Sequence, residues 1–250
     1  MSCALPGQAS VCFFASTDEL FFYFITECVF LENIVIVGSS GHAKVIIDIV
    51  EHEGRYKIAG LLDRFRSVGE QTLGYEVLGQ EEDLPQLIKS QSLSGMIVAI
   101  GDNFVRAEVA MSIAEICPAL HFVHAIHPRA SIAKEVVIGE GTVIMAGVSV
   151  NPSCSIGRHC ILNTHSSLDH DSVMEEFSSL GPRATTGGNC RIGSYSAVSI
   201  GATLIHNVRI GEHAIVGAGS AVLKNLESFT VAYGTPAKVI RERKKGDAYL

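Results

Sequence analysis

Aliphatic residues recur at every sixth position through the second half of the chain. From Ile132 to Val222 sixteen such positions follow in unbroken phase, and only Thr186 departs from the aliphatic rule. They are Ile132, Ile138, Ile144, Val150, Ile156, Leu162, Leu168, Met174, Leu180, Thr186, Ile192, Val198, Leu204, Ile210, Val216 and Val222. Four residues after each position the side chain is nearly always small. One inward aliphatic residue and one small residue per hexad predict a three-sided parallel β-helix with about 18 residues per coil.

The chain before this repeat alternates between strand and helix patterns. The run IVIVG (34–38) is β-branched and ends in glycine, and AKVIIDIVEHEG (43–54) has helical apolar spacing before a glycine stop. YKIAGLLD (56–63) and GMIVAIGDN (95–103) have the pattern of further strands, the second followed by a helix-like stretch at 104–116. Such alternation predicts a small Rossmann-like parallel sheet with its ligand crevice at the carboxyl ends of the strands.

The segment GSSGH, from Gly38 to His42, lies at this predicted crevice. Glycines let the backbone approach a phosphate at a helix N-terminus, where unpaired N–H groups and the helix dipole favour an anion. We therefore expect Ser40, Gly41 and His42 to contact a nucleotide, and Asp63 to accept hydrogen bonds from its ribose or base. The full GxGxxG motif is absent, so the residues alone favour a tight turn in an α/β core equally well.

Composition and charge narrow the class of protein. The 47% of hydrophobic residues can fill a sizeable core, and 19 Lys and Arg against 26 Asp and Glu give a net charge of −7. Basic residues cluster only at 241–245, which argues against nucleic acid as a partner. The seven cysteines include no CxxC pair, and Cys154, Cys160 and Cys190 fall on the small-residue positions of the repeat. We expect packing roles for these three thiols and a reducing, cytoplasmic location.

Residues 1–30 are apolar enough to suggest a signal or membrane segment, but their charged residues do not fit either kind of segment. The first basic residue of the chain is Lys44, and Asp18, Glu19 and Glu27 interrupt the apolar runs. We interpret the stretch as an appendage. A sharper hypothesis is that translation begins at Leu31 from an alternative start codon, which N-terminal sequencing of the natively expressed protein would test.

The patterns divide the chain into four segments. They are an N-terminal extension (1–32), a Rossmann-like domain (33–125), a β-helix (126–241) and a polar tail (242–250). The expected fold class is therefore α/β followed by all-β.

The repeat resembles the left-handed β-helix of hexapeptide-repeat acyltransferases, and the left hand is implied by that resemblance, because ordinary parallel crossovers are right-handed. Four further motifs extend the similarity over about 33–241. They are GSSGHAK (38–44), LLD (61–63), VAIGDN (98–103) and YGTPAKVIR (233–241). Together they resemble the sugar acyltransferase family, which includes sialic-acid O-acetyltransferases and N-acetyltransferases of nucleotide-linked 4-amino sugars.

That resemblance carries expectations for ligands and assembly. It implies an N-terminal domain that binds a nucleotide-sugar, trimerisation through the β-helix, and acetyl-CoA in a groove between adjacent subunits. By the same resemblance Asn103 joins the nucleotide-sugar residues and Asn163 lines the site. The residues implied to line the CoA groove are Ser179, Ile200 and Ala218.

The motif DHD at 169–171 is the candidate catalytic centre. His170 is the third residue of its hexad, so its side chain points off the helix, and Gly188 lies one coil above it at roughly 5 Å. Acyl transfer needs a base for the nucleophile's proton and a donor for the oxyanion. We expect His170 as general base, Asp171 as its orienting carboxylate and the Gly188 N–H as an oxyanion donor, and the family's base lies in a matching acidic-His-acidic motif. Taken alone, DHD is more typical of a solvated corner.

The sequence differs from the family pattern at two positions, and two other functions stay open. Ser179 stands where the family has a second histidine, and Arg183 where glycine is common, which leaves a non-catalytic nucleotide-sugar-binding trimer as an alternative. The γ-class carbonic anhydrases share the β-helix and bind zinc through histidines, but the neighbouring coils offer Arg129, Lys134 and Gly188 instead of a further ligand. His165 fits a substrate contact or a surface position.

The sequence thus predicts a homotrimeric acetyltransferase that moves acetyl from acetyl-CoA to the amino group of a nucleotide-linked 4-amino sugar, with UDP the favoured nucleotide, for surface glycan biosynthesis. O-acetylation of sialic acid or a related sugar is the alternative. We expect no metal, no membrane span and no nucleic acid partner.

Overall fold

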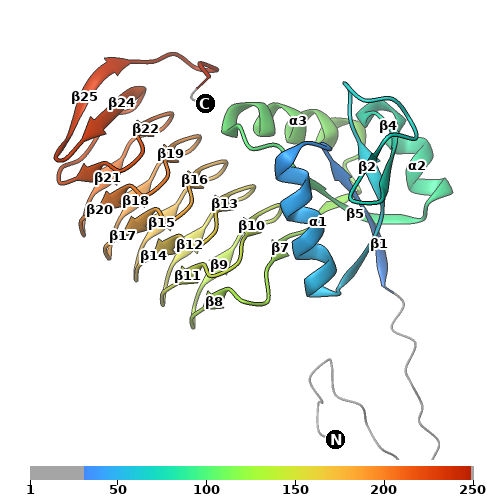
Figure 1. Cartoon of the computed structure of the whole chain (residues 1–250), viewed down its shortest axis with the longest axis horizontal. Helices are drawn as coiled ribbons and strands as arrows, with labels where there is room; N and C mark the ends of the chain where they lie inside the picture. Colours follow the sequence, from blue (N-terminus) through green and yellow to red (C-terminus); the bar gives the residue numbers. More distant parts are fainter. Residues whose placement is uncertain (1–30, 249–250) are drawn as a thin grey trace, which may run out of the picture. The chain divides into compact units, whose positions relative to one another are not determined.

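The computed structural model describes residues 31–248, in which an α/β part precedes a parallel β-helix (Figure 1). The predicted N-terminal appendage and its proposed start-site explanation concern residues 1–30, which lie outside the described residues. Within residues 31–248 every helix is too short or too polar to cross a lipid bilayer.

The α/β part is a six-stranded sheet in the order β3-β4-β2-β1-β5-β6, parallel except for the β3–β4 pair. Its strands are β1 (Glu32–Val37), β2 (Tyr56–Leu62), β3 (Gln71–Thr72), β4 (Tyr75–Gly79), β5 (Leu93–Val98) and β6 (His121–Phe122). Its helices are α1 (Gly41–Glu53), α2 (Leu84–Ser90) and α3 (Asn103–Ile116), with a 3₁₀ turn at Glu81–Asp83. The strands and helices predicted at 34–38, 43–54, 56–63, 95–103 and 104–116 are confirmed, whereas β3, β4 and α2 were not foreseen.

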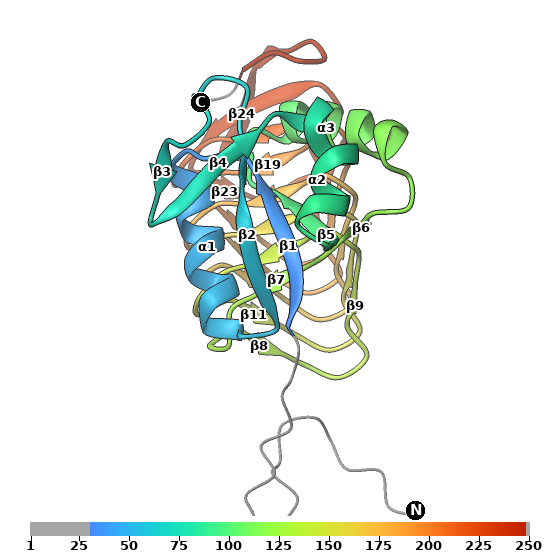
Figure 2. The same ribbon diagram turned by 90° about the vertical axis from the view of Figure 1, so that its right-hand side faces the viewer.

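Both faces of this sheet are covered, as its continuous apolar strands require. Helix α1 lies on one side of the sheet, and α2 and α3 lie on the other (Figure 2). Ile34 and Ile36 of β1 pack with α1, while Val35 and Val37 pack with α2 and α3. Helix α1 ends where Gly54 adopts a left-handed conformation with φ of 64°. The core around α1 continues without a break into the first coils of the β-helix, so the two parts share one hydrophobic core.

The β-helix has three faces of two-residue strands (Figure 1). The first face comprises β7 (Ala125–Ile126), β10 (Val143–Ile144), β13 (Ile161–Leu162), β16 (Ser179–Leu180), β19 (Ala197–Val198) and β22 (Ile215–Val216). The second comprises β8 (Ser131–Ile132), β11 (Ser149–Val150), β14 (Ser167–Leu168), β17 (Thr185–Thr186), β20 (Thr203–Leu204) and β23 (Ala221–Val222). The third comprises β9 (Val137–Ile138), β12 (Ser155–Ile156), β15 (Val173–Met174), β18 (Arg191–Ile192) and β21 (Arg209–Ile210).

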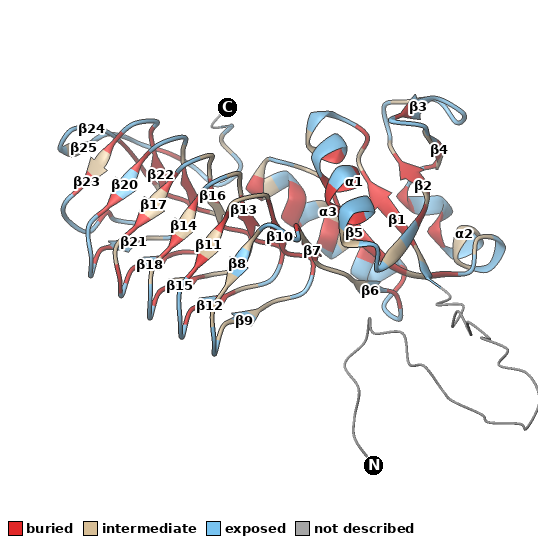
Figure 3. Ribbon diagram, turned by 60° about the horizontal axis from the view of Figure 1, so that its bottom comes forward, coloured by how far each residue is buried: buried red, intermediate tan, exposed pale blue. Residues whose placement is uncertain are grey.

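The predicted repeat is confirmed residue by residue. Each of the sixteen sixth-position residues closes one of the strands β8 to β23, and paired strands are one 18-residue coil apart, as Val143 with Ile161 shows. From Ile144 onward these residues are buried in the interior (Figure 3). Cys154, Cys160 and Cys190 are buried free thiols whose pKa values burial raises, so the expected packing role is confirmed.

One corner of the β-helix carries a stack of rings that the sequence did not reveal. We call it the aromatic corner, and it joins the third face to the first. Its rings are those of His159, Phe177, Tyr195, His213 and Phe229, with successive centroids 4.5 to 5.5 Å apart. Arg106 of α3 donates to the backbone oxygen of His159 at 2.9 Å and of Phe177 at 3.3 Å, so this corner anchors the α/β part.

The C-terminal segment closes the last coil. β24 (Thr230–Gly234) extends the first face, and β25 (Ala237–Glu242) pairs with it antiparallel. Beyond them Arg243 is buried and donates to the backbone oxygens of His213 and Asp247, while the Lys245 ammonium lies 5.5 Å from the centre of the Phe104 ring. Arg243 thus anchors the start of the predicted polar tail, because carbonyls at the end of the aromatic corner need a donor, while Lys244, Lys245 and Gly246 are exposed.

Candidate active site

His170 and Asp171 form a hydrogen-bonded pair on the corner between the second and third faces, which we call the polar corner. Nδ1 of His170 lies 2.7 Å from Oδ2 of Asp171, and the two side chains are 53% and 55% exposed. The hydrogen bond to Asp171 raises the pKa of His170. The neutral ring therefore carries its proton on Nδ1, which leaves the lone pair of Nε2 available as a base.

The backbone around this pair is held by its neighbours. Oδ1 of Asp169 accepts from the His170 N–H at 2.9 Å and from the Asn151 amide at 2.6 Å. Asp171 has a φ of 56°, and its N–H donates to the oxygen of Pro152 one coil below. A positive φ suits Asp better than most residues, so the corner geometry itself favours a carboxylate here.

Gly188 lies directly against the His170 ring. A Cβ at position 188 would lie 2.5 Å from both Cε1 and Nε2 of His170. The imidazole therefore stacks on a glycine backbone one coil above, as the repeat predicted, and only the absence of a side chain permits that position. An exposed imidazole that is oriented by a carboxylate can take a proton from a nucleophile that approaches from solvent.

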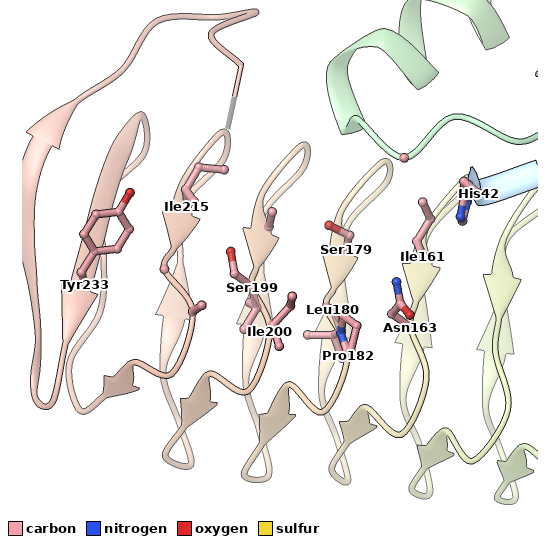
Figure 4. A pocket seen from close by; sticks show the side chains of 16 residues that line it. His42, Ile161, Asn163, Ser179, Leu180, Pro182, Ser199, Ile200, Ile215 and Tyr233 are labelled. Carbon is pink, nitrogen blue, oxygen red and sulfur yellow. The ribbon is translucent and has the colours of Figure 1, made fainter. Parts of the chain in front are cut away.

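An apolar cavity of about 500 Å³ runs along the first face of the β-helix (Figure 4). Its floor is made of outward side chains from successive coils, with Tyr233 at one end and His42 of α1 at the other. Five predicted site residues are brought together here. They are His42, Asn163, Ser179, Ile200 and Ala218. His170, Asp171 and Gly188 are not among the residues around this cavity, because they lie on a different corner.

His42 is held neutral at the end of the cavity. Burial, and next the charge of Arg106, lower the pKa of His42 to about 4. Its Nε2 is buried and has no hydrogen-bond partner among the described residues. An unsatisfied buried nitrogen costs free energy unless a ligand or water completes it, which indicates a ligand-binding position.

Asn103 is not among the residues that line this cavity. The side chain is buried, and its Nδ2 donates to Oγ of Ser179 at 3.1 Å and to the backbone oxygen of Ser196 at 3.1 Å. Its Oδ1 accepts from Arg106 at 2.6 Å. Asn103 therefore bridges α3 and the β-helix and holds Ser179, a residue of the first cavity, while its predicted contact with a nucleotide-sugar stays a prediction.

A second cavity, of about 310 Å³, opens at the carboxyl ends of β1, β2 and β5. Ser40 and Asp63 line it, as predicted, whereas Gly41 is the exposed first residue of α1 beside it. The Asp63 carboxylate accepts from Oγ of Ser39 at 2.5 Å and from the N–H of Phe65 at 2.8 Å. Gly101 lines both cavities, so the two lie next to each other at this loop.

Sequence reasoning missed three residues that shape these sites. Arg106 donates to the oxygens of Ile100 and Gly101 and so fixes the loop between the cavities. Tyr233 packs its ring where a Cβ of Gly217 would stand. Phe65 lines the second cavity, and its only sequence signal is its position two residues after LLD.

One cluster among residues 31–248 has the composition of a metal site, formed by Asp48, His52 and His127. It involves neither His165 nor His170. Nδ1 of His127 accepts from the Arg129 N–H at 2.9 Å, so the neutral ring carries its proton on Nε2. A protonated nitrogen is not a ligand, and the cluster does not favour the carbonic anhydrase alternative.

Comparisons with known proteins agree with this architecture. Residues 33–113 match the PglD N-terminal domain, and residues 135–170 match the bacterial transferase hexapeptide family. A histidine-to-alanine mutant of GDP-perosamine N-acetyltransferase from Caulobacter crescentus, solved with CoA and GDP-perosamine, is 35% identical with a TM-score of 0.79, over 84% of this chain and 97% of that one.

Two further relatives point the same way. The acetyltransferase domain of PglB from Neisseria gonorrhoeae FA1090, solved with acetyl coenzyme A, is 28% identical with a TM-score of 0.78, over 84% of this chain and 100% of that one. UDP-N-acetylbacillosamine N-acetyltransferase of Bacillus subtilis (strain 168) is 35% identical over 113 residues, 45% of this chain. The match spans 50% of that curated relative's length.

Proposed function

Since this chain belongs to the family of hexapeptide-repeat sugar acetyltransferases, we propose that it transfers acetyl from acetyl-CoA to the amino group of a nucleotide-linked 4-amino sugar. The observation that carries this proposal is the solvent-facing His170–Asp171 pair against Gly188. Relatives named as N-acetyltransferases of a GDP-linked and a UDP-linked sugar support nitrogen as the acceptor.

His170 acts as the general base. Its Nε2 takes a proton from the sugar amine as the amine nitrogen attacks the thioester carbonyl carbon. The imidazolium that forms is stabilised by Asp171, whose carboxylate already holds Nδ1–H at 2.7 Å. When the tetrahedral intermediate collapses, the C–S bond breaks, the amide remains on the sugar, and the imidazolium returns the proton to the thiolate of CoA.

The negative oxygen of that intermediate needs a donor. The Gly188 N–H is the first candidate, because the absence of a side chain lets a substrate approach as closely as the His170 ring does. Ser179 is the second. Its Oγ accepts from Asn103 at 3.1 Å, so its own hydroxyl proton is directed elsewhere and can meet the thioester oxygen.

The two cavities divide the ligands between them. The long apolar cavity, with Ile200 and Ala218 on its wall, suits the pantetheine arm of acetyl-CoA. The cavity at the strand ends suits the nucleotide, with Ser40 and Asp63 beside it. The sugar then passes Gly101 toward His42 and Asn163, where the unsatisfied Nε2 of His42 can hydrogen-bond to it.

We propose a homotrimer, because one chain holds the pieces of the site on different corners. The base lies on the polar corner, whereas the acetyl-CoA cavity lies on the first face, on the far side of the second face. Packing three chains around a threefold axis brings the polar corner of one beside the first face of the next. The outward residues of the second face are small and would allow that approach. They are Ser131, Ser149, Ser167, Thr185, Thr203 and Ala221.

Thiol release measures this function directly. Acetyl-CoA is offered with UDP- and GDP-linked 4-amino sugars and with free sialic acid, and the product is weighed by mass spectrometry. We expect thiol release with one nucleotide-linked amino sugar and a product heavier by one acetyl group. Turnover of sialic acid alone would mean O-acetylation. A nucleotide-dependent rise in melting temperature without thiol release from any acceptor would mean a binding protein.

A further inference from the structure

Phe65 is the most exposed large apolar side chain among the described residues, at 96% exposure. It lines the cavity at the strand ends together with Ser40 and Asp63. A phenyl ring left in water at the mouth of a cavity is the arrangement expected when a ligand, and not the protein, covers it.

The turn that carries Phe65 is rigidly held. Asp63 accepts the Phe65 N–H at 2.8 Å while also accepting from Ser39, and Arg64 pairs with the buried Glu81 at 2.9 Å. After the ring, Arg66 donates to Glu70 at 2.9 Å and to Thr72 at 2.7 Å, so the backbone is held on both sides of Phe65. The exposure of Phe65 therefore comes from an ordered turn, so a ligand that stacks on the ring need not order the backbone that carries it.

The other side of the cavity is also apolar. Val105 and Val109 of α3 line it, and Val105 is itself exposed. The polar groups, among them Ser40, Asp63 and the glycine-rich turn at Gly38, lie at the strand ends in between. An apolar slot beside a polar turn matches a nucleotide, whose flat base is apolar on its faces and whose ribose and phosphates are polar.

We propose that Phe65 is the stacking platform for the nucleobase of the sugar nucleotide, with Val105 and Val109 facing it across the slot. The proposal rests on the proposed function, which places the nucleotide in this cavity. A base at Phe65 determines which end of the sugar nucleotide lies in each cavity. The base lies at Phe65, the diphosphate passes the α1 N-terminus, and the sugar passes Gly101 into the apolar cavity that ends at His42.

Binding of UDP, GDP and acetyl-CoA to the full chain tests the proposal without requiring turnover. The variants are Phe65→Ala, the ring-preserving Phe65→Tyr, and Val68→Ala as a control for an exposed apolar residue of the same loop that does not line the cavity. Base stacking on an aromatic side chain predicts that Phe65→Ala raises the Kd of the bound nucleotide about 5- to 100-fold. Phe65→Tyr and Val68→Ala should remain near wild type, and the Kd of acetyl-CoA should be unchanged in all three.

The contrary outcomes are distinct. If wild type binds UDP or GDP and Phe65→Ala binds it no worse than Val68→Ala, Phe65 is not the platform while the proposed function stands. If wild type binds neither nucleotide, both proposals fail. If Phe65→Ala leaves nucleotide binding intact but changes the sedimentation coefficient, the ring contacts another copy of the chain and the stacking role is overturned.

Discussion

The polar corner and the aromatic corner use histidine in opposite ways on the same backbone. His159 and Asp171 occupy equivalent corner positions with φ values of 53° and 56°, and His170 precedes Asp171 directly. His159 is 3% exposed and stacks on Phe177 with centroids 5.0 Å apart. His170 is half exposed and donates to a carboxylate.

The pKa values of the two rings follow from these surroundings. Burial, and next the charges of Arg106 and Arg158, lower the pKa of His159 to about 3, so its ring stays neutral and serves packing. The hydrogen bond that His170 donates to the Asp171 carboxylate raises the pKa of His170, so its ring binds a proton readily. The residue type and the repeat are shared, and the neighbours decide whether a histidine packs or reacts.

The largest expected effect separates the two corners by activity. His170→Ala should lower kcat by about 10²- to 10⁴-fold with little change in KM, because proton transfer is lost while both cavities remain. His159→Ala should instead lower the free energy of unfolding by about 2–4 kcal/mol, because a buried stacked ring is deleted. Steady-state kinetics and urea unfolding of both variants check this. Activity of His170→Ala within a few-fold of wild type would remove the residue from its role.

A methyl group added at Gly188 tests whether the position of the His170 ring matters for catalysis. In Gly188→Ala the new Cβ would stand 2.5 Å from the His170 ring, and the exposed ring is the part that can move away. We expect about a 10²-fold loss of kcat with stability nearly unchanged, since a misplaced base is costly. Lys224→Ala, on the same corner two coils further on, is the control. Equal kinetics for the two variants would show that the ring position does not matter.

The strands of the β-helix could be predicted because one residue in every six points into the interior and must be aliphatic. The position of that residue marks the end of each two-residue strand. The pairing of His170 with Gly188 followed from the same 18-residue period. The aromatic corner could not be predicted in this way, because its members mix histidine with phenylalanine and tyrosine, which no hydrophobic pattern groups together.

The contacts that join the α/β part to the β-helix could not be predicted, because they depend on how the two parts dock. The motif predicts Asn103 as a substrate residue, but its contacts with Ser179 and Arg106 depend on how α3 docks on the coils, which no motif reveals. The short strands β3 and β4 have too few residues to show a period. Phe65 is visible as a site residue only once the strand ends that surround it are assembled.

Acid stability tests the aromatic corner. The pKa of His159 is lower in the folded chain than its ordinary 6.5, so as pH falls from about 6.5 toward 3 the unfolded chain binds the proton first and stability is lost. His159→Phe keeps a ring in the stack and removes the proton site. Between pH 7 and pH 4 the free energy of unfolding should fall less in His159→Phe than in wild type, by on the order of 2 kcal/mol. Parallel pH dependence in both proteins would contradict the assignment.

The smallest expected effect is a shift in a pH profile. Asp171→Asn keeps a residue that tolerates the positive φ but removes the carboxylate that raises the pKa of His170. The pKa of His170 should fall, so the ring stays neutral to lower pH and the acid limb of kcat/KM should move to lower pH. An unmoved limb would mean that Asp171 is only a solvated corner residue.

The central claim is that one active site draws its base and its acetyl-CoA cavity from two different chains. Co-expression of His170→Ala chains with Ala218→Trp chains, whose cavity wall is filled, tests it directly. Each variant alone should be nearly inactive. Random assembly into closed trimers in equal amounts gives about one quarter of sites an intact base beside an intact cavity, so about a quarter of wild-type activity should return. Mixed assemblies that remain as inactive as their parents would show that each chain holds a complete site and would contradict the account.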